Sequence, residues 1–110
     1  MQVDSISSDL IRGHIDRILL RFFQDGDSYG YEIIKSITRR SGGKYELKEP
    51  SLYTSLKRLE KESFIQSYWG EEAQGARRKY YHITGTGRVA LKQSIAQWLA
   101  AQRIINAIFL

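Results

Sequence analysis

The sequence predicts a mainly α-helical domain in which three helices precede a two-stranded hairpin and one long helix follows it. Apolar residues recur at helical spacing in four segments of the chain. Two short segments between residues 65 and 83 are rich in aromatic and β-branched residues and are separated by glycine. Stretches that contain serine, glycine or proline stand at the junctions. A helix followed by a hairpin, after two earlier helices, is the order of a winged helix-turn-helix.

The first helix is expected from Asp9 to Gln24. Ser8 or Asp9 is expected to cap its start, and Asp25-Gly26-Asp27 to end it, because glycine tolerates the left-handed conformation that follows many helices. The residues expected on its apolar stripe are Ile11, Ile15, Ile18 and Phe22, with Leu19 and Phe23 beside them.

The second helix is expected from about Tyr29 to Arg40, with Ser28 as its cap and Ser41-Gly42-Gly43 as its end. Its buried side would be Ile33, Ile34 and Ile37. An extended link from Lys44 to Lys48 follows. Pro50 then belongs in the first turn of a third helix, because proline has a fixed φ and no N–H to leave unpaired.

The third helix, from Pro50 to Glu62, has two different faces. Leu52, Leu56 and Leu59 make one apolar stripe that is expected to face inward. The opposite side carries hydrogen-bond donors that reach phosphates and base edges, namely Thr54, Lys57, Arg58 and Lys61. A helix built this way can lie in a DNA groove, although a basic helix face alone is more often a solvated surface.

The hairpin is expected from Ile65 to Glu71 and from Arg78 to Ile83, with Gly70 and Gly75 near its turn. Three adjacent cations, Arg77-Arg78-Lys79, repel one another unless an anion is near. That anion is either a DNA phosphate or, for part of the cluster, Glu71 and Glu72 paired across the strands. Among four aromatic residues, one or two are expected to be exposed: Tyr68, Trp69, Tyr80 and Tyr81.

The last segment, from Arg88 to Leu110, carries a heptad-like apolar seam. The seam consists of Leu91, Ile95, Trp98, Ile105 and Phe109, with Gln102 between them and a second row of Ala101, Ile104 and Ile108. It is wider than one small domain can bury, so a partner helix is implied, most simply from a second copy. We therefore expect a homodimer that suits palindromic DNA, with residues 1–87 as the DNA-binding unit and residues 88–110 as the dimerisation helix.

Composition limits the function classes. The chain has 110 residues, enough for one modest core, with a formal net charge of +5 that suits a polyanion such as nucleic acid. It has no cysteine, which excludes disulfides, thiolate zinc sites and a cysteine nucleophile. His14 and His82 lack metal-ligand spacing, and no nucleophile motif is present, so we expect no cofactor and no enzymatic activity. No leader-like or membrane-spanning run occurs, and a cytoplasmic protein is expected.

Several short motifs, in this order, resemble the PadR family of bacterial transcriptional regulators. They are Leu10-Ile11-Arg12-Gly13, Tyr29-Gly30-Tyr31-Glu32-Ile33, Leu52-Tyr53, Arg58-Leu59-Glu60, Tyr68-Trp69-Gly70 and Arg77-Arg78-Lys79-Tyr80-Tyr81 with Ile83-Thr84. The single C-terminal helix resembles the short-form branch. The resemblance implies winged helix-turn-helix homodimers that generally repress detoxification or efflux genes, many of which leave DNA when a small molecule binds. The alternative is a winged helix that binds another protein without specific DNA contact.

The resemblance also implies roles for individual residues. It puts Ser51, Tyr53, Thr54, Lys57 and Arg58 on the recognition helix, and Gln74 to Lys79 on the wing. In members that bind many drugs, a tryptophan at the position of Trp98 lines a pore between subunits. The matching wall here would be Leu10, Asp16, Trp98, Gln102 and Ile105, which suits a planar aromatic or cationic effector, although Arg17 offsets Asp16.

Three places depart from the family pattern, one of which is Ala76 in the wing beside Gly75. Ser63 replaces the usual glycine after the third helix and would need a positive φ or a shifted helix end. Gly85-Thr86 makes a poor helix start, so the last helix is expected to fray there.

Overall fold

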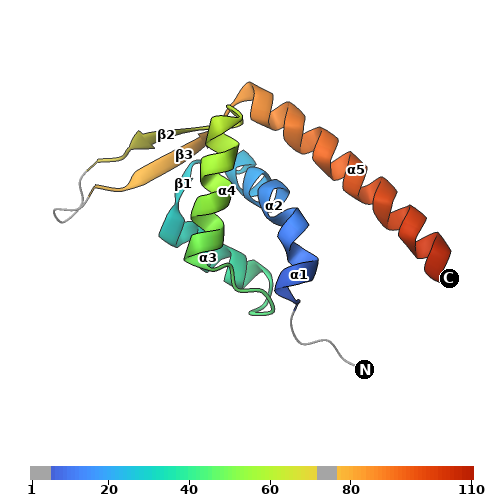
Figure 1. Ribbon diagram of the computed structural model, residues 1–110. Coiled ribbons are helices and arrows are strands. Elements are labelled where there is room, and N and C mark those ends of the chain that lie inside the picture. Colours follow the sequence, from blue (N-terminus) through green and yellow to red (C-terminus); the bar gives the residue numbers. More distant parts are fainter. Residues whose placement is uncertain (1–5, 72–76) are drawn as a thin grey trace.

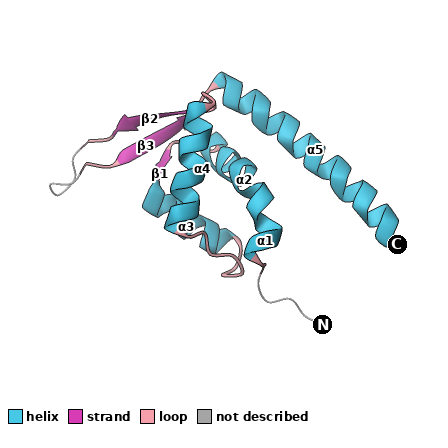
Figure 2. Cartoon of the chain, viewed as in Figure 1, coloured by secondary structure: helices cyan, strands magenta, loops and turns pink. Residues whose placement is uncertain are grey.

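A computed structural model describes residues 6–71 and 77–110 and confirms the predicted fold class (Figure 1). The elements are α1 (Ser8–Ile11), the 3-10 helix η1 (Arg12–His14), α2 (Ile15–Gln24), β1 (Ser28–Tyr29), α3 (Gly30–Arg40), α4 (Glu49–Lys61), β2 (Ile65–Trp69), β3 (Lys79–Ile83) and α5 (Gly85–Phe109). The strands form a small sheet at one side of the helices, and the C-terminal part of α5 extends beyond the other elements (Figure 2). Within the described ranges, none of these helices combines the length and apolar character needed to cross a bilayer.

The N-terminal helix is not continuous, contrary to expectation. The chain forms α1, tightens into η1 and continues as α2. Gly13 lies inside η1, and glycine is a poor former of helix interiors, which explains the irregular turn. The cap is Ser7 rather than Ser8 or Asp9, because the Ser7 hydroxyl accepts the Leu10 N–H at 3.2 Å.

Ser28 does not cap the second helix as expected. Ser28 and Tyr29 form β1, which pairs antiparallel with Tyr81 and Tyr80 of β3 and makes the hairpin a three-stranded sheet of order β1-β3-β2. The Ser28 hydroxyl instead donates to the carboxylate of Glu32. The short strand anchors the start of α3 to the wing.

One core joins the helices to the sheet. The inward stripe of α4 is confirmed, since Leu52, Leu56 and Leu59 are at most 2% exposed. The predicted stripe of the first helix is only partly right. Ile15, Leu19, Leu20 and Phe23 are buried, whereas Ile11, Ile18 and Phe22 are partly exposed. Those three residues lie over a pocket described below.

Two turns position the last helix. Ser63 has the positive φ that its place requires, 65°, and the N–H groups of Ser63 and Phe64 donate to the carbonyls of Glu60 and Leu59 to close α4. The expected fraying at Gly85-Thr86 is wrong: α5 begins at Gly85 because the Thr84 hydroxyl accepts the Gly87 N–H at 3.0 Å.

Candidate nucleic-acid interface and adjoining pocket

The outward face of α4 is exposed as the sequence predicted. All six residues assigned to it are accessible: Ser51, Tyr53, Thr54, Lys57, Arg58 and Lys61. They occupy the side opposite the buried leucines, so hydroxyl, ammonium and guanidinium donors stand on one surface. This surface and the wing beside it form the candidate interface.

A surface hollow of about 340 Å³ lies where α3, α4 and the wing meet. Its walls come from the start of α3, from Tyr53 and from the wing: Tyr29, Gly30, Tyr31, Tyr53, Arg77, Arg78, Lys79 and Tyr81. The Tyr53 ring packs closely over Gly30, because a Cβ on Gly30 would stand 2.5 Å from the Tyr53 hydroxyl oxygen and would displace that side chain. The first N–H groups of α3 and three cations give this hollow the character of an anion site.

The wing cations stack on aromatic rings. The guanidinium of Arg78 lies 4.6 Å from the centre of the Tyr29 ring, and that of Arg77 lies 5.4 Å from the Trp69 ring. These contacts order the side chains without neutralising them. Glu71 forms no ion pair with either arginine within the described residues, and Glu72 and Gln74 lie outside them. Positive charge therefore remains on the wing.

The wing aromatics divide as expected. Tyr68 and Trp69 are 43% and 57% exposed, whereas Tyr81 is 5% exposed. Asp27 in the loop before β1 ties two strands together: it accepts the Tyr68 hydroxyl and lies 2.8 Å from Nδ1 of His82. Burial alone would raise the pKa of Asp27, but hydrogen bonds from Tyr68 and His82 outweigh it and lower the pKa. These contacts join the loop before β1 to β2 and β3.

The side chain of Arg58 on α4 forms an ion pair with a carboxylate on α2. Its Nε and Nη2 donate to the two carboxylate oxygens of Asp16 on α2, at 2.8 and 2.7 Å. The hydrogen bonds from Arg58 to Asp16 raise the pKa of Arg58. Asp16, which the family resemblance placed at an effector site, therefore faces α4.

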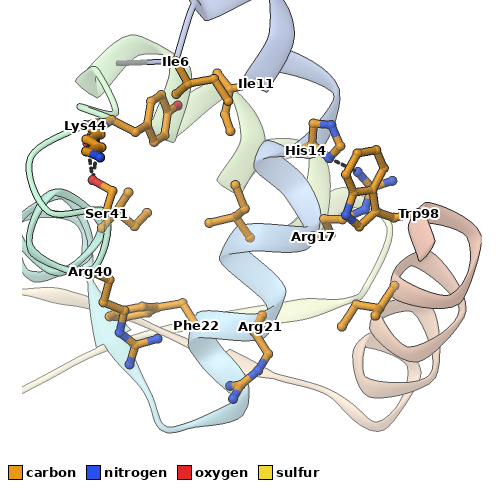
Figure 3. A pocket seen from close by; sticks show the side chains of 14 residues that line it. Ile6, Ile11, His14, Arg17, Arg21, Phe22, Arg40, Ser41, Lys44 and Trp98 are labelled. Atoms are coloured by element: carbon orange, nitrogen blue, oxygen red, sulfur yellow. Dashed lines mark hydrogen bonds between the residues drawn. The ribbon is translucent and has the colours of Figure 1, made fainter. Parts of the chain in front are cut away.

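A pocket of about 620 Å³ lies between α2, the end of α3 and α5 (Figure 3). Its walls are mostly apolar. The apolar side chains include Ile11, Ile18, Phe22, Ile37, Ile95 and Trp98. Four cations, Arg17, Arg21, Arg40 and Lys44, also line it. Asp25 pairs with Arg21 and Arg40, at 2.8 and 3.3 Å.

His14 and Trp98 make one wall of the pocket. Their rings meet edge to face with centres 4.4 Å apart. Arg17 donates to Nδ1 of His14 at 2.6 Å and to the Ser94 hydroxyl at 2.8 Å, so it joins α2 to α5. Burial, followed by the charge of Arg17, lowers the pKa of His14, and the ring is neutral at pH 7.

Of the five expected effector residues, only Trp98 lines this pocket. Leu10 is 70% exposed, and Gln102 and Ile105 lie further along α5. Sequence reasoning missed His14 and Phe22 as pocket residues. The helical spacing of Ile11, Ile18 and Phe22 was visible, but the same spacing describes a core stripe.

The expected dimer residues also fall in different surroundings. Leu91 is 1% exposed and belongs to the core of its own protomer, so its assignment to the dimer interface is wrong. Ile95 and Trp98 are half-buried, and Ile105 and Phe109 are 45% and 77% exposed. Elsewhere, no three His, Asp or Glu side chains of the described ranges gather as metal ligands.

The chain is similar to known regulators. A sequence model described as the transcriptional regulator PadR-like family matches residues 19–93. An uncharacterized protein of Lysinibacillus sphaericus is 41% identical over 101 residues, which cover 92% of this chain and 93% of that protein.

Two solved structures extend the likeness to the fold. A transcriptional regulator from Clostridium thermocellum is 45% identical with a TM-score of 0.84, over 90% of this chain and 96% of that one. A PadR family transcription regulator from Clostridium difficile is 32% identical with a TM-score of 0.75, over 89% of this chain and 100% of that one.

Proposed function

The chain belongs to the PadR-like family of DNA-binding transcriptional regulators, which are not enzymes, and we propose that it is a homodimeric repressor of detoxification or efflux genes. In this proposal it acts in the cytoplasm, binds a palindromic operator and leaves it when a small molecule binds. The assignment to a DNA-binding family weighs against the alternative of a winged helix that only binds another protein.

One observation carries the proposed DNA contact: Tyr53, which shares the exposed side of α4 with Thr54 and Lys57, lines the same hollow as the cations of the wing. With α4 in the major groove, Thr54 and Lys57 would meet base edges. Lys61 and the wing cations would meet phosphates, and the N–H groups at the start of α3 would hold a phosphate in the hollow.

The second half of α5 supports the proposed homodimer. Ile104, Ile108 and Phe109 are 63%, 77% and 77% exposed in the protomer. Soluble monomers rarely expose contiguous apolar patches of this kind. A second copy related by a two-fold axis would cover them and would place two copies of α4 on the two halves of a palindrome.

The pocket is the proposed effector site. It touches α2, α3 and α5 together, so a ligand there would change how the dimerisation helix sits on the DNA-binding unit. Trp98 supplies an aromatic wall. Its cations outnumber Asp25, which favours a neutral or anionic aromatic molecule over the planar cation that Asp16 had suggested.

Selection from a random pool of DNA duplexes tests this function. The protein should enrich a palindromic sequence. Replacing Thr54 or Lys57 by Ala should change the preferred bases. Replacing Arg77 and Arg78 together by Ala should instead weaken binding to all duplexes. It should also lower the slope of log affinity against log salt concentration by about two, because each substitution would remove one phosphate contact.

Arg12 and Lys92 provide the matched control, since both are exposed cations outside the proposed interface. Their double replacement by Ala removes the same charge and should leave the salt slope nearly unchanged. A pool from which no duplex is enriched would contradict the proposed function.

A further inference from the structure

A carboxylate from α2 holds the guanidinium of Arg58 side-on. The N–H of Nε and one N–H of Nη2 are taken by Asp16, at 2.8 and 2.7 Å. Nη2 also donates to the hydroxyl of Ser55 at 3.1 Å. These contacts fix the plane of the guanidinium and leave the N–H groups of Nη1, which have no protein partner within the described residues.

This pair stands at the surface on which DNA is proposed to lie. The side chains of Arg58 and Asp16 are 52% and 36% exposed, and Arg58 shares its helix face with Thr54 and Lys57. An exposed ion pair adds little to folding stability. Asp16 also places a negative charge beside the proposed path of the phosphates, which weakens general attraction to DNA. The pair therefore serves neither stability nor general affinity well.

Its geometry suits a third role. An arginine side chain has many rotamers, and ordering it in a complex costs affinity unless it is ordered beforehand. Asp16 supplies that order from a separate helix, and the remaining donor, Nη1, lies at the corner of the guanidinium away from the carboxylate. Its natural ligand is an acceptor atom on the duplex, either a phosphate oxygen or a base edge.

We propose that Asp16 is a positioning residue for DNA recognition, which holds Arg58 with Nη1 directed at an acceptor of the operator. The proposal rests on the DNA binding proposed above. Arg58 remains a DNA contact, but its contribution depends on a residue outside the recognition helix.

The test uses the full-length protein and two duplexes of equal length, one enriched by the wild type from a random pool and one scrambled. Asp16→Asn should weaken binding to the enriched duplex by roughly 5- to 20-fold, because Arg58 loses its orientation. Binding to the scrambled duplex should stay the same or tighten by up to about threefold, because a negative charge is lost. The ratio of the two affinities is the readout.

Asp9→Asn is the matched control. Asp9 also pairs with an arginine, Arg12, at 3.0 Å on an exposed surface. This substitution should change the ratio by less than about twofold. Arg58→Lys keeps the charge but has no guanidinium to bind the carboxylate side-on or to present Nη1, so it should lower the ratio at least as much as Asp16→Asn. Combining the two substitutions should lower the ratio no further than Arg58→Lys alone, because Asp16 acts only through Arg58.

Two results are distinguishable failures. If the wild type enriches no duplex, the proposed function itself is contradicted. If it enriches one and Asp16→Asn leaves the ratio unchanged or tightens binding to both duplexes equally, the pair only joins α2 to α4, and Asp16 does not position Arg58 for DNA. The urea midpoint of each variant shows that the folded protein is being compared.

Discussion

The two halves of α5 share one apolar pattern but lie in opposite surroundings. Along the same seam, exposure rises from 1% at Leu91 to 45% at Ile105 and 77% at Phe109. In the first half the seam lies against the rest of the protomer, whereas the second half extends beyond it (Figure 1). The comparison shows that one periodic pattern serves two tasks, because a helix longer than its own domain presents the end of its apolar face to water.

The largest expected effect is the loss of the dimer when charges replace apolar residues in the exposed half of α5. Replacing Ile105 and Phe109 together by Asp should convert a dimer to a monomer, because two charges would be buried without partners in the proposed interface. Sedimentation equilibrium measures the mass. Val89→Asp is the control, since Val89 is 58% exposed on the first half of the same helix and should leave the dimer intact. A dimer that survives the double substitution would place the interface elsewhere.

A smaller effect is expected from a substitution in the packed half of α5. Leu91→Ala should lower the free energy of unfolding by about 2 to 5 kcal/mol, because it removes a buried side chain and leaves a cavity. Val89→Ala, two residues earlier and exposed, should change it by less than about 0.5 kcal/mol. Urea unfolding at one fixed protein concentration measures both, since the proposed dimerisation would make stability depend on concentration. Equal losses for the two variants would contradict the assignment of Leu91 to the core.

Helical spacing in the sequence predicted some of these surroundings and not others. Spacing identified the buried leucines of α4 and the outward donors, because a helix with one apolar and one basic face has a single sensible orientation. The family resemblance left two outcomes for Ser63, a positive φ or a shifted helix end, and the structure has the positive φ. Spacing did not separate Leu91 from Phe109, because both satisfy the same seam, and only the length of the surrounding body decides which is covered.

Other features depended on contacts between distant residues. β1 has two residues, too few for a period of two to be visible, and it exists because Tyr80 and Tyr81 pair with it. The partner of Asp16 lies on another helix, so a carboxylate expected beside a ligand is bound to Arg58. Phe22 shares the spacing of a core residue but lines a pocket.

The smallest expected effect concerns the middle of α5, where the packed half ends and the ring of Trp98 contacts that of His14. Burial and Arg17 lower the pKa of His14 in the folded protein. The unfolded chain therefore binds the proton more readily, and the free energy of unfolding falls as the pH decreases through the ordinary histidine range, near 6.5. Above that range both states hold His14 neutral, and its contribution is constant.

Thermal unfolding between pH 5 and 8 measures this effect. The midpoint of the wild type should fall more steeply with acidity than that of His14→Gln, because glutamine does not titrate. The same difference should persist in a His82→Gln background, since His82 lies against Asp27 on the wing and not beside Trp98. Identical slopes for the wild type and His14→Gln would mean that the ring of His14 carries its proton equally well folded and unfolded. The contact with Trp98 would then be indifferent to charge, and the packed half of α5 would be insensitive to pH at this point.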